Sequence, residues 1–198
     1  MIEDLIRKNR CCRRFYQYQK ISVTDLEDFI NLARLSASAG NLQPLKYIIS
    51  CDQEKNKEVF SCLKWVAYLE DWDHPKDGEQ PPAYIIVIGD NEKAKDMGYD
   101  CGIACQSILL GAREKGMAGC IIGTVSRKNL RNFLNLNERY KILLVLAIGK
   151  PKEDVMIENV TSDEDIKYWR DAKGVHHVPK RSLKDIILKC YKKNDQDK

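Results

Sequence analysis

Two apolar runs constrain the fold more than any other feature of the sequence. Ala83–Gly89 (AYIIVIG) and Ile142–Ile148 (ILLVLAI) are rich in aliphatic residues, and hardly a polar side chain interrupts them. A strand that is apolar at successive positions must be covered on both of its faces. The runs therefore predict buried strands of a layered, mixed sheet that is wrapped by helices.

Shorter patterns place the other elements. Helical spacing predicts helices at 2–9, from the Ser22 cap onward, and at 54–68, 93–115, 127–134 and 182–190. Further strands are expected at 47–51 and 120–122. Two strand–helix–strand units thus follow one another, and right-handed crossovers would make part of the sheet parallel.

Composition narrows the class of protein. The 198 residues are enough for about one domain, and no apolar run approaches the ~18 residues of a spanning helix. Basic residues exceed acidic ones by only four (33 against 29), without the concentrated basic face that nucleic-acid binders usually carry. The start, MIEDLIRKNR, has acids where a signal peptide needs a basic region followed by an apolar stretch. We therefore expect a cytoplasmic protein with no nucleic-acid partner and no membrane partner.

Metal and disulfide chemistry find little support. Eight cysteines are too few for a disulfide scaffold, and neither Cys-x-x-Cys nor paired zinc spacing occurs. Cys101 and Cys105 share one face of a predicted helix, which suits small buried residues. The adjacent His176 and His177 would point in different directions, so a shared metal is not expected.

Two segments carry chemistry suited to an anionic or hydrogen-bonding ligand. Arg10 and Arg13 lie in the sequence RCCRRF, where clustered guanidinium groups suit a phosphate. The alternative is a solvated basic turn. The segment 36–44 combines small residues with the carboxamides of Asn41 and Gln43, which donate and accept hydrogen bonds. The alternative there is a loop that only ends the preceding helix.

Two further segments are weaker candidates. Ile122 and Gly123 end a predicted strand, where ligands gather in layered folds, and the glycine would let a flat ligand pack on the backbone. A turn that ends the strand explains them equally well. Lys180 and Arg181 would either meet a phosphate or flank the last helix.

Missing motifs also guide the interpretation. The sequence has no Gly-x-Gly-x-x-Gly after a strand, no phosphate-binding Gly-Lys-Ser/Thr loop and no Gly-x-Ser-x-Gly elbow. None of its three histidines lies near a candidate nucleophile. We find no catalytic set made of side chains alone, so an enzyme of this sequence would rely on a bound cofactor.

Taken together and in order, these segments resemble the FMN-dependent nitroreductase family over residues 1–190. Its opening pattern, Arg-Arg-Ser-x-Arg-x-Phe, stands here as NRCCRRF, and its Pro-Ser-Ala-x-Asn-x-Gln-Pro-Trp stands as ASAGNLQPL. The family's central helix, flavin-side strand end and late basic motif are matched at 100–110, 119–123 and 178–181. Asn9, Cys11 and Leu45 depart from the family's Arg, Ser and aromatic residue.

The resemblance implies an α+β fold, with a mixed central sheet wrapped by helices, as one FMN-binding domain at 1–190 and a frayed tail at 191–198. Two chains would form an intertwined homodimer with FMN at the interface. Arg10, Cys11, Lys180 and Arg181 would bind the phosphate end, and Arg13 would lie near N1 and O2 of the ring. Ile122 and Gly123 would line the ring near N5. The residues implied to reach FMN from the other subunit are Ser38, Ala39, Asn41 and Gln43.

The implied reaction passes a hydride from NADH or NADPH to flavin N5 and on to a small planar acceptor by a ping-pong mechanism. Nitroaromatic and quinone-like molecules are the expected acceptors, and no side chain is expected to be catalytic. Trp65, Tyr68 and Trp72 are candidates to cover the acceptor, although Trp65 and Tyr68 would equally suit core packing. Residues 168–169 are a further candidate for lining the acceptor site. A flavin-storing dimer and a reductive dehalogenase are the alternative functions.

Overall fold

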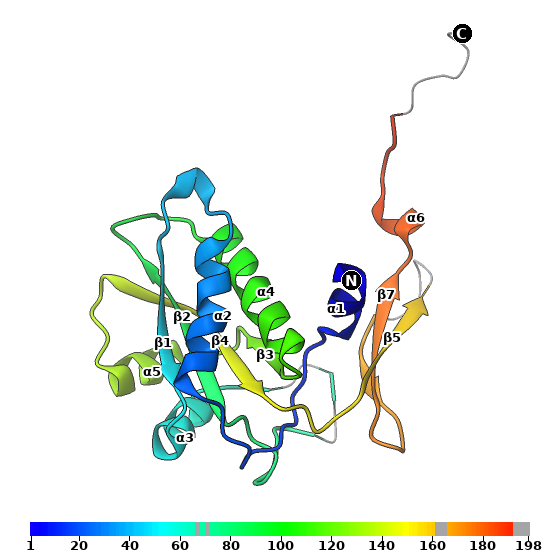
Figure 1. Cartoon of the computed structure of the whole chain (residues 1–198), viewed down its shortest axis with the longest axis horizontal. Coiled ribbons are helices and arrows are strands. Elements are labelled where there is room, and N and C mark those ends of the chain that lie inside the picture. Colours follow the sequence, from blue (N-terminus) through cyan, green and yellow to red (C-terminus); the bar gives the residue numbers. More distant parts are fainter. Residues whose placement is uncertain (66–67, 70–71, 161–165, 192–198) are drawn as a thin grey trace. The chain divides into compact units, whose positions relative to one another are not determined.

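The computed structural model describes residues 1–65, 68–69, 72–160 and 166–191 (Figure 1). The chain divides into two compact units, Met1–Glu153 and Asp154–Lys198. The single domain at 1–190 stays a prediction, and nearly all of the predicted frayed tail, 192–198, lies outside the described residues. The elements of the first unit are α1 (Ile2–Lys8), α2 (Val23–Leu35), η1 (Ala39–Asn41), β1 (Leu45–Ser50), α3 (Gln53–Ser61), β2 (Ala83–Asp90), α4 (Gly98–Glu114), β3 (Ala118–Ile122), α5 (Arg127–Leu134) and β4 (Tyr140–Gly149).

The sheet of the first unit has the strand order β1-β2-β4-β3, and each neighbouring pair is antiparallel. The α+β class is therefore confirmed, but the expected parallel pairing within the crossovers was wrong. β2 and β3 do run in the same direction, because both are antiparallel to β4. β4 lies between them and takes up their hydrogen bonds. A parallel pairing does occur at the isolated bridge between Cys11 and Gly119.

β2 is buried along its whole length, as its apolar run predicts. Alternate side chains point to opposite faces of a strand. Ala83, Ile85 and Val87 belong to one core with α2 and α4, while the even-numbered residues 84, 86 and 88 belong to the other core with α3 and α5. The sheet is thus covered on both faces, and α2 and α4 pack side by side on one of them (Figure 1).

Local chemistry sets the ends and the spacing of these two helices. The Ser22 side chain caps α2 by accepting a hydrogen bond from the Asp25 amide at 3.0 Å. A Cβ on Gly111 of α4 would collide with the Leu32 side chain of α2. Glycine at this position therefore allows the close approach of the two helices.

Two predicted helices are shorter than expected. The helix predicted over 54–68 ends at Ser61, because Leu63 forms a bridge to Val125 and the Lys64 amide donates to the Thr124 carbonyl at 3.0 Å. Tertiary pairing here overrides helical spacing. The predicted last helix shrinks to α6 (Leu183–Ile186), although Ser182 does form the expected capping box.

The second unit contains a sheet of its own. β5 (Val155–Val160) pairs in parallel with β7 (His176–Arg181), and β6 (Trp169–Arg170) pairs with β7 from the other side in antiparallel fashion. Sequence patterns did not predict these strands, because β7 (HHVPKR) is polar and contains a proline.

Candidate functional site

The segment Cys12–Tyr16, here called the arm, is held through its main chain by distant parts of the first unit. Each of its five amide N–H groups has an acceptor on a remote segment. The amides of Cys12, Phe15 and Tyr16 donate to the main-chain carbonyls of Gly119 at 3.0 Å, Glu79 at 2.9 Å and Lys150 at 3.0 Å, respectively. The amides of Arg13 and Arg14 both donate to the Glu153 carboxylate, the latter at 3.2 Å. The arm is therefore fixed although it forms no helix or extended strand of its own.

The two predicted arginines differ in their surroundings: Arg10 precedes the arm and Arg13 lies within it. The Arg13 side chain is buried, and its Nε donates to the Trp65 carbonyl at 3.2 Å. Arg10 donates from Nη2 to the Ile6 carbonyl at 2.8 Å, while its buried Nε has no hydrogen-bond partner among the described residues. A buried donor without an acceptor is costly, so the Arg10 site is incomplete as it stands.

Cys11 is exposed and lies beside the start of β3. The neighbouring Cys120 thiol, helped by the positive charges of Arg13 and Arg10, lowers the pKa of Cys11 to about 6. The same interaction, together with burial, raises the pKa of the Cys120 thiol well above its usual range. Cys11 is therefore the thiolate of this pair near neutral pH.

Two glycines at opposite ends of β3 differ in the space around them: Gly119 lies near the start of the strand and Gly123 follows its end. A Cβ on Gly119 would lie 2.5 Å from Leu109 Cδ2 and 2.6 Å from the Ala147 carbonyl oxygen, so the arm passes close to a crowded backbone. A Cβ on Gly123 would meet Leu144 Cδ2 only at an ordinary 3.6 Å. Gly123 is exposed and Ile122 is buried, which leaves main chain open to a ligand at the strand end.

The loop at 36–43 is strained and is held by one carboxylate. Gly40, Asn41 and Gln43 all have positive φ (56°, 53° and 49°), which is uncommon for residues other than glycine. Asp100, at the start of α4, accepts the Ser38 hydroxyl at 3.0 Å and the Ala39 amide at 2.7 Å. The Gln43 side chain turns back to the Asn41 main-chain and side-chain oxygens at 3.3 and 3.2 Å.

A cavity of about 240 Å³ opens beside this loop. Its polar wall contains Ser38, Gln43 and Asp100, and its floor includes Tyr47, whose pKa burial raises to about 12. The loop therefore borders a space that a ligand edge can enter.

Among the described residues no three His, Cys, Asp or Glu side chains are placed to hold a metal ion, and no described helix is long and apolar enough to cross a membrane.

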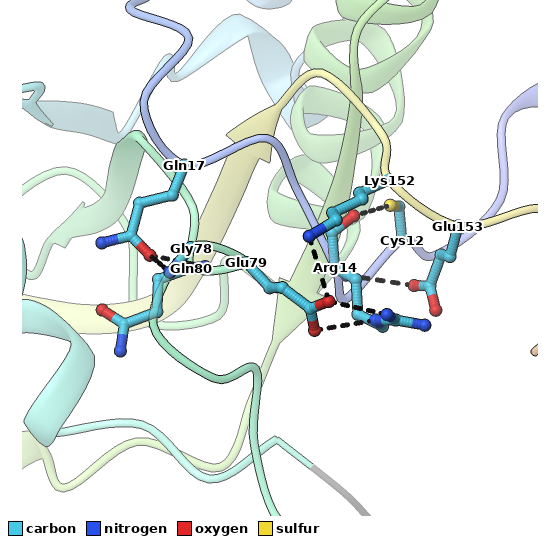
Figure 2. Close-up of polar contacts among 8 residues, drawn as sticks. All are labelled: Cys12, Arg14, Gln17, Gly78, Glu79, Gln80, Lys152 and Glu153. Atoms are coloured by element: carbon cyan, nitrogen blue, oxygen red, sulfur yellow. Dashed lines mark hydrogen bonds and ion pairs between the residues drawn. The ribbon is translucent and has the colours of Figure 1, made fainter.

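An ion-pair network supports the arm from outside (Figure 2). The Arg14 guanidinium donates to both carboxylate oxygens of Glu79, at 2.8 and 2.6 Å, and Lys152 approaches the same carboxylate at 3.3 Å. The Gln17 side-chain oxygen accepts from the amides of Gly78 and Gln80, at 2.7 and 3.0 Å. The loop at 76–80 is thus tied to the arm and to the end of β4.

The structure brings some of the predicted residues together and separates others. The arm is joined to the segment after β3 in two steps. Arg13 donates to the Trp65 carbonyl, and residues 63–64, just before Trp65, pair with residues 124–125. Ser38 and Ala39 contact Asp100, whereas Asn9, just before the arm, reaches Gln106 at 3.5 Å. At about 100° per residue, Asp100 and Gln106 face different sides of α4. One chain therefore presents the two sets of residues on two sides of the same helix.

The remaining candidates have mixed surroundings. Trp65 is buried and lies 5.6 Å from Phe60 between ring centroids, as core packing would place it. Trp72 packs partly buried against the same core, while Tyr68 is exposed. Lys180 and Arg181 are exposed at the end of β7, in the second unit. Their predicted roles stay predictions.

Sequence reasoning missed Asp100 and Glu153. Asp100 lies in the first turn of α4, where carboxylates are favoured, but the helix was predicted to begin at 93, which hid this signal. No local pattern marked Glu153, whose contacts with the arm span 139 and 140 residues of sequence.

Comparison with known proteins gives a consistent result. The sequence model of the Nitroreductase family matches residues 6–150. A protein of Archaeoglobus fulgidus named as an NADH dehydrogenase/NAD(P)H nitroreductase is 31% identical over 149 residues, which cover 71% of this chain and 80% of that protein. An oxygen-insensitive NADPH nitroreductase of Helicobacter pylori is 23% identical, over 84% of this chain and 95% of its own. An FMN-dependent nitroreductase of Clostridium difficile has the same fold, with a TM-score of 0.62 and 22% identity over 87% of this chain and 94% of its own.

Proposed function

The chain belongs to the nitroreductase family, a family of oxidoreductases, and on that premise we propose that it is an FMN-dependent NAD(P)H oxidoreductase. Bound FMN would supply the chemistry, accepting a hydride at N5 from NADH or NADPH and passing it to a small planar acceptor in a ping-pong cycle. Nitroaromatic and quinone-like molecules are the proposed acceptors. The observation that carries this proposal is the fixed arm, with Arg10 and Arg13, beside the open main chain at Gly123.

The donors around the arm suit the two anionic parts of FMN. The phosphate carries nearly two negative charges at neutral pH, and Arg10 has a buried Nε that lacks an acceptor among the described residues. Arg13 is buried, and a cation in such surroundings stabilises the negative charge that reduced flavin gains at N1 and O2. Cys11 would lie by the phosphate and ribityl chain, and Lys180 and Arg181 would complete the phosphate site.

The other residues of the proposed site bind and orient. Gly123 and Ile122 would let the flat ring lie on main chain near N5, because no Cβ projects from Gly123. Ser38, Ala39, Asn41 and Gln43 belong to a loop whose shape Asp100 fixes. The main chain of that loop would keep its shape on binding, while the Gln43 carboxamide would exchange its bonds with Asn41 for the ring edge.

We also propose that the working molecule is a homodimer. The loop residues and the arm lie on different sides of α4, so a second copy is the natural source of the missing set. Large apolar side chains are exposed on and near this helix, which is typical of a surface that a partner covers. They are Leu35, Leu42, Tyr99 and Ile103, with exposed fractions of 65%, 52%, 81% and 40%.

The proposal is tested with purified full-length protein. FMN titration, followed by flavin absorbance and fluorescence, should give saturable binding, and light scattering should give the mass of two chains. NADH or NADPH should then be oxidised when menadione or a nitrofuran is added. A protein that ignores added FMN would refute the proposal, and one that binds FMN but is not reduced by either nicotinamide would favour flavin storage instead.

A matched pair of variants links the result to the arm. Arg13→Gln should weaken FMN binding by about tenfold or more, because a desolvated cation is lost. Arg7→Gln is the control, since Arg7 is an exposed arginine of the same region that pairs with Glu3 at 2.8 Å. Lys180→Ala and Arg181→Ala should each weaken FMN binding, with a smaller effect at higher salt. Equal FMN affinity in Arg13→Gln and the control would contradict the assigned role of Arg13.

A further inference from the structure

Glu153 holds the arm in a way that none of its other acceptors does. Three of the five arm amides donate to main-chain carbonyls, which any residue supplies. Glu153 is the side chain in this set, and it serves both Arg13 and Arg14. The position of the Arg13 main chain therefore depends on one carboxylate that lies after the end of β4.

The place of that carboxylate is itself fixed by pairing. Phe15 forms an antiparallel bridge with Pro151, the Tyr16 amide donates to the Lys150 carbonyl at 3.0 Å, and the Lys152 amide donates to the Arg14 carbonyl at 2.8 Å. This short ribbon sets the register between the arm and the segment 150–153. Glu153 then turns its carboxylate back onto the arm, as its contact with Arg14 shows in Figure 2.

The geometry carries this constraint from the main chain to the Arg13 guanidinium. The Arg13 amide donates to the Glu153 carboxylate, and its side-chain Nε donates to the Trp65 carbonyl at 3.2 Å. Arg13 is therefore held both at its main chain and at its guanidinium. We propose that Glu153 is a positioning residue that aims Arg13 at the flavin and thereby sets the affinity for FMN and its reduction potential. The inference rests on the proposed function, because it needs a flavin beside Arg13.

The hydrogen bonds of the Glu153 carboxylate and its negative charge should have opposite effects on the reduction potential of bound FMN. Two variants of Glu153 can therefore separate the two effects. Glu153→Gln keeps a side-chain oxygen that accepts both amides but removes a negative charge near Arg13. The reduction potential of bound FMN should then rise, because the cation acts on reduced flavin with less opposition. Glu153→Ala removes the same negative charge but also leaves two amides without their acceptor and releases Arg13, so its potential should lie below that of Glu153→Gln and FMN should bind about tenfold more weakly or worse.

The experiment compares wild type, Glu153→Gln, Glu153→Ala and a control from the same network. Glu79→Ala is the control, because it removes the ion pair with Arg14 and Lys152 but no acceptor of an arm amide, the Glu79 carbonyl being main chain. FMN affinity is measured by titration and the potential by spectroelectrochemistry. Hydrogen exchange of the Arg13 and Arg14 amides is measured without FMN, so that the contact is tested independently of the flavin. Glu153→Asp, whose shorter carboxylate cannot keep both contacts, replaces Glu153→Ala if the latter does not fold.

The expected pattern is protected amides in wild type and Glu153→Gln, fast exchange in Glu153→Ala, a potential that rises in Glu153→Gln, and a potential in Glu153→Ala that is lower than in Glu153→Gln. Glu79→Ala should keep the wild-type potential and FMN affinity. If the exchange pattern appears but both Glu153 variants keep the wild-type potential and affinity, the positioning role is overturned while the proposed function stands. If wild type does not bind FMN, the proposed function and this inference fall together.

Discussion

Asp100 binds Ser38 across 62 residues of sequence, its Oδ2 accepting the serine hydroxyl at 3.0 Å. Its other oxygen accepts the Ala39 amide at 2.7 Å, and the Ser38 oxygen in turn accepts the Gln43 amide at 2.9 Å. A buried carboxylate thus shapes a loop in which three residues have positive φ. The pair connects the start of α4 to the loop that we assign to the flavin of a second subunit.

Removing this carboxylate should loosen the loop. Asp100→Ala leaves the Ala39 amide without its acceptor, so the free energy of unfolding should fall by about 1–3 kcal/mol. FMN binding should weaken as well, because the loop no longer keeps its bound shape in the free protein. Denaturant unfolding and FMN titration measure the two effects. The matched control, Asp96→Ala, removes a carboxylate from the exposed approach to the same helix; equal losses in both variants would argue against a special role for Asp100.

Substituting alanine for Gly119 and for Gly123, at the two ends of β3, should affect different properties of the protein. Gly119→Ala places a Cβ against Leu109 and the Ala147 carbonyl, so it should destabilise the fold by about 1–3 kcal/mol. Gly123→Ala meets only an ordinary contact at 3.6 Å and should keep the wild-type stability. It should nevertheless weaken FMN binding, because its methyl group occupies the open main chain. A Gly123→Ala protein that binds FMN like wild type would remove this glycine from the site.

Cys11 should react as a thiolate at a pH where ordinary thiols are protonated. With a pKa of about 6, about nine-tenths of it is ionised at pH 7, and its reaction with iodoacetamide should slow as the pH falls through 6. Peptide mass spectrometry measures the rate for each cysteine separately. Cys120→Ala removes the interaction that contributes most, so the midpoint should move to higher pH. FMN should protect Cys11 in both proteins, and an unchanged midpoint in Cys120→Ala would rule out this explanation.

His177 should carry a positive charge at a higher pH than a free histidine. Glu158, at 2.7 Å from Nδ1, and then Asp171 raise its pKa above the ordinary 6.5. The stabilisation is therefore complete below about pH 6.5 and is lost as the pH rises through the folded-state pKa. NMR titration of the imidazole measures the midpoint, and the protection factors of the β7 amides, corrected for the intrinsic pH dependence of exchange, should fall above it. In Glu158→Gln the midpoint should fall; if it does not, Glu158 is not the main cause.

Sequence patterns predicted the elements whose cause is local. β2 and β4 follow from uninterrupted apolar runs, and α2 follows from the Ser22 cap and helical spacing. The pattern over 54–68 failed after Ser61, because pairing with residues 124–125 decides the conformation of Leu63 and Lys64. β7 gave no signal, since its polar sequence is stabilised by its neighbours rather than by a hydrophobic pattern.

The residues of the candidate site were likewise predicted only where a local pattern marked them. Arg10, Arg13, Asn41 and Gly123 were predicted as site residues because their residue types are unusual where they stand, and the family resemblance gave their order. Glu153 had no such signal, because a glutamate in a charged stretch after a strand is ordinary. Its importance arises from a ribbon formed with residues about 140 positions earlier, which no local pattern encodes.

The long reach of the arm has a consequence for biosynthesis. Its backbone leaves the ribosome about 140 residues ahead of the carboxylate that must bind it, a lag of roughly 10–30 s at ordinary rates of translation. During that interval the main-chain donors of Arg13 and Arg14 are left to water, and the Cys12 thiol, which the folded protein buries, stays uncovered. On the proposed function, the FMN site would be complete only after β3 has paired with β4 and Glu153 has emerged, so we expect no flavin binding by the N-terminal half of a growing polypeptide.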